Sequence, residues 1–136
     1  MRTIVLDTNC LLAILPSESR FHSVWTDLKA GRICLCVSTE ILNEYEEILQ
    51  QKVSAEFAAV VMKQVLSFPC LKRVTPTYFL QLIEADPDDN KFVDCAFCGE
   101  AELIVTNDAH FNVLATIPFP KLVVMKLQDF VELIAC

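Results

Sequence analysis

Thr3-Ile4-Val5-Leu6-Asp7 is a short apolar run that favours a β-strand and ends at an acid. The same pattern returns late in the chain, where Leu103-Ile104-Val105 is followed by Thr106-Asn107-Asp108. Two more short apolar runs lie at 33–37 and 122–125, residues 71–74 are a further short strand candidate, and amphipathic stretches lie between them. Continuous apolar strands that alternate with helices are typical of a parallel sheet covered on both faces. The sequence therefore predicts an α/β three-layer sandwich with a central, mostly parallel sheet.

The stretches between these runs carry apolar residues at helical spacing. One such helix is predicted to end at Gly31, and another is predicted to begin after Ser38 or Thr39, which are suitable N-cap residues. Residues 77–85 fit neither pattern. The predicted helices are Leu11–Leu15, Ser17–Ala30, the helix after Ser38, Phe57–Leu66, Asp89–Ala101 and Gln128–Ile134.

Length and composition limit the class of protein. The chain has 136 residues, of which 54% are hydrophobic and 21% charged, so it is long enough for one packed core and too apolar for disorder. No linker or repeat interrupts it, and we expect residues 1–136 to form a single domain. Its apolar runs are far shorter than the ~20 residues of a membrane span. An acid at Asp7 comes too early for a secretory signal, so we expect a soluble, cytoplasmic protein that does not enter membranes.

The charge distribution excludes some partners and suggests others. The net charge of −7 is unlike that of a nucleic-acid binder with a broad basic face. Between Glu84 and Asp108 there are eight acids and one base, Lys91. Such a cluster repels itself unless it is solvated or holds cations.

The seven cysteines do not suggest a disulfide framework. Their number is odd, most of them lie inside apolar runs, and buried thiols commonly act as small apolar side chains. Cys95 and Cys98 form a C-x-x-C pair, but they lie within a predicted helix and have no partner pair with zinc-site spacing. We therefore expect no disulfides.

Three acids lie where a sheet of this kind forms its active site. Ligands bind outside the carboxyl ends of the strands, so Asp7 and Asp108 share one edge if their strands are neighbours. Asp89 begins a predicted helix, where an acid is favoured by the free N–H groups. Each acid alone is also explained as a helix cap, but three together favour a shared cation.

Two further positions stay open on periodicity alone. Asp94 lies in a helix that is apolar around most of its surface, so it either lines the site or is neutralised by a hydroxyl donor; Lys91 is on another side of that helix. On the helix after Ser38, Glu44 and Glu46 border the apolar stripe on opposite flanks, and the pattern does not choose between them.

Four stretches, in order, resemble the motifs of the PIN (PilT N-terminus) domain nucleases, in particular the branch described as toxin components of toxin–antitoxin pairs. Asn107 stands where that branch often has glycine; asparagine tolerates a left-handed backbone, so the turn should survive. The stretches are Val5-Leu6-Asp7-Thr8-Asn9-Cys10-Leu11-Leu12, Ser38-Thr39-Glu40-Ile41-Leu42-Asn43-Glu44-Tyr45-Glu46-Glu47-Ile48-Leu49, Asp86-Pro87-Asp88-Asp89-Asn90-Lys91-Phe92-Val93-Asp94-Cys95-Ala96 and Ile104-Val105-Thr106-Asn107-Asp108.

The resemblance implies a set of site residues and a reaction. It selects Glu44 over Glu46 and implies that four acids, Asp7, Glu44, Asp89 and Asp108, are catalytic and hold metal, with Asp94 as a fifth candidate. Asn9 and Thr106 would orient carboxylates or water through hydrogen bonds without binding the metal themselves. A carboxylate site without an evident basic partner suits Mg²⁺ or Mn²⁺. The implied substrate is single-stranded RNA, cut by a metal-activated water.

Partners and alternatives complete the sequence-based hypothesis. The resemblance implies a small antitoxin protein as partner, and apolar residues such as Phe119 or Val131 would serve a homodimer or the core. His110, two residues after Asp108, is a further candidate for substrate contact. One alternative is a PIN-fold binding or regulatory domain without turnover. The other is a Mg²⁺-dependent phosphohydrolase that uses Asp7 as nucleophile, although its motif needs an acid where this chain has Asn9.

Overall fold

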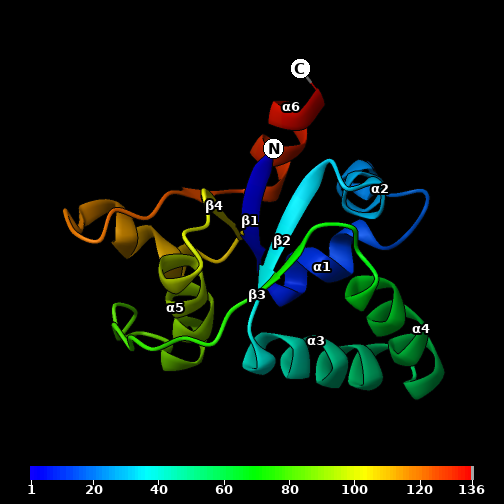
Figure 1. Cartoon of the computed structure of the whole chain (residues 1–136), viewed down its shortest axis with the longest axis horizontal. Helices are drawn as coiled ribbons and strands as arrows, with labels where there is room; N and C mark the ends of the chain where they lie inside the picture. Colours follow the sequence, from blue (N-terminus) through cyan, green and yellow to red (C-terminus); the bar gives the residue numbers. More distant parts are fainter. Residues whose placement is uncertain (136) are drawn as a thin grey trace.

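A computed structural model describes residues 1–135 of the chain. Its centre is a five-stranded sheet in the order β3-β2-β1-β4-β5, and every neighbouring pair is parallel. Figure 1 shows β1 near the middle of the fold. The predicted α/β sandwich with a parallel sheet is confirmed. The strands are β1 (Arg2–Leu6), β2 (Ile33–Val37), β3 (Leu71–Arg73), β4 (Leu103–Val105) and β5 (Val124–Met125).

The order of the strands reverses at β1. The chain adds β2 and β3 on one side of β1, then returns to add β4 and β5 on the other side. Leu6 is therefore in register with Val105, although the two are far apart in sequence. In open α/β sheets this reversal marks the place where ligands bind, at the carboxyl ends of the strands.

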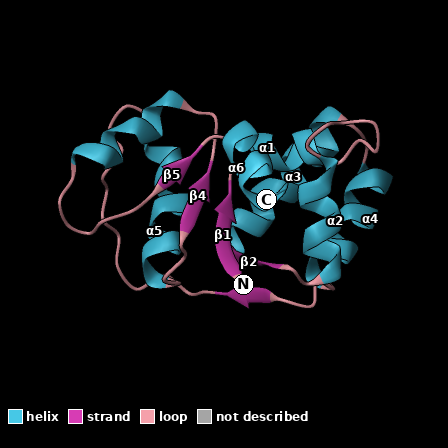
Figure 2. Cartoon of the chain, turned by 90° about the horizontal axis from the view of Figure 1, so that it is seen from above, coloured by secondary structure: helices cyan, strands magenta, loops and turns pink. Residues whose placement is uncertain are grey.

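Helices cover both faces of the sheet (Figure 2). Helix α5 (Asn90–Cys98) and the 3₁₀ segment η2 (Ala109–Thr116) lie on one side. On the other side lie α1 (Thr8–Ile14), α2 (His22–Ala30) and α6 (Leu127–Ala135), and the hairpin of α3 (Thr39–Lys52) and α4 (Ala55–Leu66) extends from that side. Among residues 1–135, no helix is long and apolar enough to cross a bilayer.

Buried apolar residues explain the strands and tie the layers together. All five residues of β2 and all three of β4 are buried, as expected for strands covered on both faces. Tyr45 of α3 is fully buried, and its hydroxyl donates to the carbonyl of Leu6 at the end of β1. This contact fixes α3 against the edge of the sheet where Asp7 follows.

Local signals account for most helix ends. The Ser38 side chain accepts a hydrogen bond from the Ile41 N–H at 3.3 Å and caps α3. Gly31 ends α2 with a left-handed φ of 77°, a conformation that favours glycine. The predicted start of α2 at Ser17 is wrong: turns occupy residues 17–21, where the Ser19 N–H bonds to the Pro16 carbonyl.

Two segments differ from simple expectation. The predicted helix beginning at Asp89 is preceded by a 3₁₀ turn, η1 (Pro87–Asp89), and α5 proper starts at Asn90. The segment η2 was not predicted, because its sequence lacks a clear helical period. Residues 74–83 contain no helix or strand. They are nonetheless held in place, because Ile83 is buried and exchanges two hydrogen bonds with the Asn90 amide, at 2.9 and 3.0 Å.

The expectation that no disulfide forms is wrong. Cys34 of β2 and Cys70, just before β3, are joined by a disulfide. The cause is the pairing of these strands: the Leu35 N–H donates to the Cys70 carbonyl at 3.0 Å, which brings the two cysteines to a Cα–Cα distance of 4.6 Å. Cys10, Cys36, Cys95 and Cys98 are free thiols, so the C-x-x-C pair in α5 is reduced.

Candidate functional site

The carboxyl ends of β1 and β4 bring two predicted site residues together. Asp7 follows β1, and Thr106 follows β4; the side chains of both are buried. The Thr106 hydroxyl donates to Asp7 Oδ2 at 2.7 Å and accepts the Asp108 N–H at 3.0 Å. Thr106 therefore holds Asp7 and the backbone of Asp108 in a fixed relation. The exposed Asn9 contributes its backbone N–H as a further hydrogen-bond donor to Asp7.

A cluster of potential metal ligands lies beside Asp7. Asp86, Asp89, Asp108 and His110 each offer one ligand atom, and these atoms lie within 4.8 Å of one another. His110 Nδ1 is 3.4 Å from Asp108 Oδ1 and 3.8 Å from Asp89 Oδ2. We call these four residues the acid cluster. The sequence had singled out Asp89 and Asp108, but Asp86 had been interpreted as part of a turn.

The spacing of Asp86 and Asp89 contains a signal that sequence reasoning missed. Asp86 precedes the 3₁₀ turn Pro87–Asp89, and Asp89 is its last residue. The Asp89 N–H donates to the Asp86 carbonyl at 3.1 Å. Residues three apart lie on the same side of such a turn. An acid at each end of a Pro-containing 3₁₀ turn therefore places two carboxylates on one side.

Burial and mutual repulsion act on the carboxylates of this site. Asp89 Oδ2 is buried and has no hydrogen-bond partner among the described residues. Burial, followed by the negative charges of Asp108 and Asp86, raises the pKa of Asp89 to about 7. Burial also raises the pKa of Asp7, against the lowering effect of the Thr106 hydrogen bond, with smaller contributions from Asp108 and Glu44. Like charges in a partly buried site are relieved by a cation.

Glu44 reaches the same region from α3 but in a different electrostatic state. The Thr8 hydroxyl donates to its Oε2, and Lys91 Nζ lies 2.6 Å from its Oε1. Lys91 also lies 2.8 Å from Asp88 Oδ1. Burial lowers the pKa of Lys91, but the bonds to Asp88 and Glu44 outweigh it and leave that pKa raised. The expectation of a site without a basic partner is therefore wrong at Glu44, because the side chain of Lys91 extends from α5 to α3.

Glu44 and Glu46, which periodicity could not distinguish, lie in different environments. Glu44 is half-buried against Thr8 and Lys91, whereas Glu46 is exposed. The negative charge of Glu44 contributes to the raised pKa of Asp7. Glu44 thus lies near the carboxyl end of β1, as the resemblance to the PIN motifs implied.

Asp94 lies elsewhere than in the acid cluster. Its side chain is buried in α5, and its Oδ1 accepts the backbone N–H of Leu80 at 3.0 Å. Burial raises the pKa of Asp94, the Leu80 hydrogen bond lowers it, and the charge of Glu40 raises it. The hydroxyl donor considered for Asp94 is wrong, because the donor is the backbone amide of Leu80. Asp94 also lies in the wall of a cavity.

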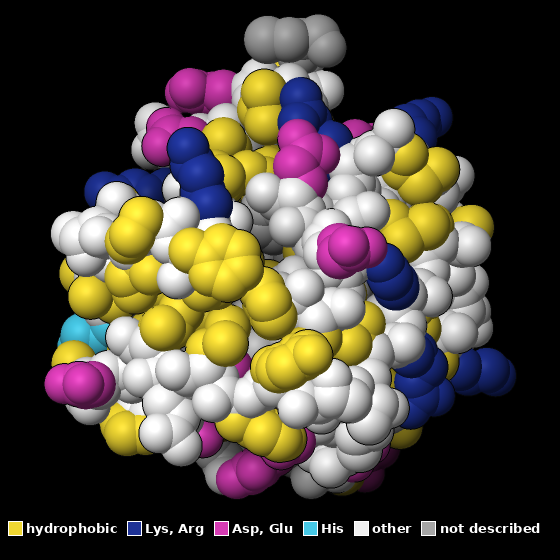
Figure 3. Space-filling model, turned by 60° about the vertical axis from the view of Figure 1, so that its left-hand side comes forward, with side chains coloured by type: hydrophobic (Ala, Val, Ile, Leu, Met, Phe, Trp, Pro, Cys, Tyr) yellow, Lys and Arg dark blue, Asp and Glu magenta, His cyan; other side chains and the backbone are white. Residues whose placement is uncertain are grey.

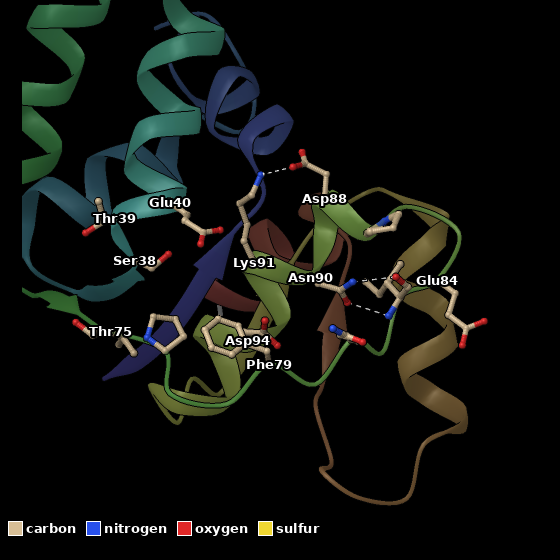
Figure 4. A pocket seen from close by; sticks show the side chains of 15 residues that line it. Ser38, Thr39, Glu40, Thr75, Phe79, Glu84, Asp88, Asn90, Lys91 and Asp94 are labelled. Carbon is tan, nitrogen blue, oxygen red and sulfur yellow. Dashed lines mark hydrogen bonds and ion pairs between the residues drawn. The ribbon is translucent and has the colours of Figure 1, made fainter.

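This cavity has a volume of about 790 Å³, and Figure 4 shows the side chains that line it. Residues from α3, from the segment after β3 and from α5 line it, including Ser38, Glu40, Phe79 and Asp94. Asp88 and Asn90, the neighbours of Asp89 in sequence, also belong to its wall. The cavity wall and the acid cluster therefore use adjacent residues at the start of α5.

Asn107 does not adopt the left-handed backbone that the sequence comparison allowed for. Among the described residues, the non-glycine positions with positive φ are Gln81 and Glu100. The Asn107 side chain instead accepts the Leu127 N–H at 3.0 Å, at the first residue of α6. Asn107 thus connects the turn that carries Asp108 to the C-terminal helix.

The molecule also has an exposed apolar face. Figure 3 shows hydrophobic side chains gathered on the side of the molecule that carries α5 and its neighbouring loops. Phe119, which was considered for the core or a dimer, is 81% exposed, whereas Val131 of α6 is half-buried. Tyr78 packs its ring edge-on against Phe97, with centroids 5.9 Å apart, in a groove that Phe119 also lines.

Comparisons with solved structures identify similar folds. The structure of VapBC from Salmonella typhimurium bound to DNA matches with a TM-score of 0.63 and 18% identity, over 93% of this chain and 99% of that chain. VapBC2 from Rickettsia felis, bound to a DNA fragment from its promoter, matches with a TM-score of 0.61 and 18% identity, over 91% of this chain and 98% of the other. No curated protein sequence matches the chain.

A family model, described as the PIN domain, matches residues 3–110. The matched span contains Asp7, Glu44, Asp89 and Asp108, the acids that the motifs had selected. It covers most of the 136 residues. The chain belongs to the PIN domain family.

Proposed function

We propose that this protein is a Mg²⁺- or Mn²⁺-dependent endoribonuclease that cleaves single-stranded RNA, with residues 1–136 acting as one catalytic domain in the cytoplasm. The observation that carries the proposal is the buried Oδ2 of Asp89, which lies beside Asp108 and Asp86 and has no hydrogen-bond partner among the described residues. An oxygen-rich site of this kind fits hard divalent cations better than zinc. Membership of the PIN family and the two neighbours with the same fold agree with nuclease chemistry.

The metal-holding residues in this proposal are Asp7, Asp89 and Asp108, with Glu44 at the edge of the site and Asp86 and His110 as additional ligands from the acid cluster. A bound divalent cation supplies a water of lowered pKa and stabilises negative charge on the phosphodiester. Thr106 keeps Asp7 oriented, and Asn9 supports it through its backbone N–H. Asp94 acts in the neighbouring cavity rather than as a metal ligand.

Lys91 fixes the position of Glu44 in this scheme. Its ammonium lies between Glu44 and Asp88, so Glu44 is held in place without a metal. The chain carries a net charge of −7, and therefore RNA approaches against repulsion unless cations reduce the negative charge of the site. RNA affinity is expected to fall sharply when divalent ions are removed.

The toxin role is the finer part of the proposal, and it rests on the resemblance of the four motifs to the toxin branch of the family. Its partner would be a small antitoxin protein. The exposed apolar face that includes Phe119 is available for an antitoxin or for a second copy of the chain. Growth arrest on expression, relieved by a small reading frame next to the gene, is the expected result; expression without any effect on growth contradicts it.

The catalytic proposal is tested with a labelled single-stranded RNA, Mn²⁺ or Mg²⁺ and an EDTA control. Cleavage should require the metal and should be lost in Asp89→Asn. Glu46→Gln is the matched control, because it also neutralises an acid but on the exposed side of α3. Cleavage that survives EDTA, or that Asp89→Asn leaves intact, contradicts the proposal. Manganese anomalous scattering from a soaked crystal, with a peak among Asp7, Asp89 and Asp108, would locate the ion directly.

A further inference from the structure

We propose that the cavity beside the acid cluster is a nucleobase pocket that selects guanine, with the Phe79 ring stacking on the base and the Asp94 carboxylate accepting from its Watson–Crick edge. This inference rests on the proposed function, since it gives the pocket a nucleotide next to the one whose phosphate is cut. It starts from three observations on the cavity: its charge, its exposed aromatic residue and its place along α5.

The charge of the cavity wall argues against a phosphate as its occupant. Four carboxylates, those of Glu40, Glu84, Asp88 and Asp94, line the cavity together with one ammonium, that of Lys91. Lys91 is already paired with Glu44 and Asp88. An acidic wall repels a phosphate and favours a neutral group rich in N–H donors. A nucleobase is such a group.

The aromatic residue supplies a stacking surface. Phe79 lines the cavity and is 67% exposed, so much of its ring is free to contact a ligand. Its backbone is held in place, because the next residue, Leu80, donates its N–H to Asp94 Oδ1 at 3.0 Å. Figure 4 shows the Phe79 and Asp94 side chains at the same wall of the cavity. Bases of single-stranded RNA are commonly bound by stacking on aromatic side chains.

Asp94 selects among the bases by its chemistry. A carboxylate has two oxygens with about four acceptor positions, and Leu80 uses one of them. Guanine presents two adjacent donors, N1–H and the 2-amino group, that match the two oxygens. Adenine, cytosine and uracil present an acceptor beside their donor on the same edge, and a carboxylate repels it. A buried carboxylate at 6% exposure makes this difference large, because water cannot replace the lost bond.

The position along α5 links the pocket to the chemistry. Asp88 and Asn90 belong to the cavity wall, and Asp89 between them belongs to the acid cluster. An RNA strand with a phosphate at the acid cluster therefore has a neighbouring base within reach of the cavity. Asp88 and Asp89 lie in the same 3₁₀ turn, so the two sites use neighbouring residues of the chain.

The first test measures the binding of free nucleosides to the metal-free protein, with amide chemical shifts in NMR as the readout. Guanosine should shift the amides of residues 79, 80 and 94 and bind at least about ten-fold more tightly than adenosine. Inosine, which lacks the 2-amino group, should bind between the two. Equal binding of guanosine and adenosine, or tighter binding of N-acetylarginine amide in the same cavity, overturns the proposal; the second result would assign the cavity to a protein partner.

Variants identify the residues. Asp94→Asn keeps an oxygen for the Leu80 N–H but presents a donor to guanine, and it should weaken guanosine binding by about ten-fold. Phe79→Ala should weaken the binding of all nucleosides, whereas Phe79→Tyr should bind them as the wild type does, because it keeps the ring face. Tyr78→Ala is the matched control: Tyr78 is 63% exposed but lines the other groove, against Phe97. An equal effect of Tyr78→Ala and Phe79→Ala contradicts the stacking role.

Cleavage of RNAs that differ at one position separates this inference from the proposed function. Wild-type protein should cut next to guanine about ten-fold faster, and Asp94→Asn should lose that preference while still cutting guanine-free RNA. A protein that binds guanosine but cuts no RNA with any metal overturns the proposed function and keeps the pocket. A protein that cuts RNA without a base preference and does not bind guanosine overturns the pocket alone.

Discussion

Two groups of acids lie side by side at the carboxyl edge of the sheet, and they differ in how their charge is balanced. Glu44 and Asp88 share the ammonium of Lys91 at 2.6 and 2.8 Å. The acid cluster with Asp7 instead has hydroxyl and amide donors and the half-exposed His110, and one oxygen of Asp89 has no hydrogen-bond partner among the described residues. The first group is balanced by the chain itself, whereas the second needs a cation from solution. The contrast predicts that equivalent substitutions in the two groups act in opposite directions on stability.

The largest effect is expected on activity when the unbalanced group is neutralised. Asp89→Asn, or Asp7→Asn, should lower RNA cleavage by about a thousand-fold or more, because each removes a charge that holds the metal. The same change should leave the metal-free fold as stable as before or more stable, since it removes repulsion. Cleavage rates and thermal unfolding in EDTA measure the two effects. A variant that keeps full activity, or that unfolds, contradicts the assignment.

The balanced group should respond in the opposite way. Lys91→Met keeps the aliphatic part of the side chain but leaves Glu44 half-buried without its cation, and it should destabilise the protein by about 1–3 kcal/mol. The double variant Lys91→Met/Glu44→Gln should recover part of this loss, because the unpaired charge is then gone. Urea denaturation of the single and double variants measures the coupling. A double variant that is less stable than Lys91→Met would show that Glu44 and Lys91 are not a balancing pair.

The pH dependence of stability tests both groups in one experiment. The pKa of Asp89 is raised to about 7 and that of Asp7 is also raised, so the folded state holds protons that the unfolded chain has released. The metal-free protein should therefore lose stability as pH rises from about 4 to about 7. Mg²⁺ should reduce this loss, and Asp89→Asn should flatten the curve.

Asp88 contributes with the opposite sign. The hydrogen bond from Lys91 lowers the pKa of Asp88, so its contribution is present above the usual carboxyl range and is lost on acidification. Thermal unfolding in EDTA and in Mg²⁺ between pH 4 and 8 distinguishes the two groups. A metal-free protein whose stability rises steadily through pH 7 would show that repulsion among the carboxylates of the acid cluster does not destabilise the fold.

The smallest expected effect concerns the turn that carries Asp108. Asn107→Ala removes the side-chain oxygen that accepts the Leu127 N–H at 3.0 Å, and it should cost about 1 kcal/mol, as the loss of a helix cap does. Cleavage should change little, because Thr106 still binds the Asp108 N–H. Chemical denaturation with a parallel activity assay tests this. A large loss of activity with unchanged stability would mean that Asn107 positions the acid cluster directly.

The sheet and the acids at its edge were predictable because they depend on local patterns. The central strands are built on short apolar runs, and Asp7 and Asp108 follow two of these runs. The choice of Glu44 over Glu46 was not available from periodicity, since it depends on Thr8 and Lys91, which come from α1 and α5. The resemblance to family motifs supplied that choice instead.

Other features depended on contacts that no sequence pattern shows. The Cys34–Cys70 disulfide follows from which strand lies beside β2, and seven cysteines allow many pairings. The cavity at Asp94 depends on the segment after β3, which has no periodicity because its backbone bonds to the side chains of Asp94 and Asn90 rather than to a regular partner. Asp86 was missed because a turn residue and a ligand have the same sequence appearance.

The parallel pairing of β1 with β4 has a consequence for synthesis of the protein. The first strand of the sheet is made almost at once, but its neighbour at the site, β4, ends at Val105 and Asp108 follows it. A nascent chain on the ribosome therefore holds Asp7 and Glu44 long before the remaining acids emerge. The acid cluster and Asp7 therefore cannot come together until nearly four-fifths of the polypeptide has been translated.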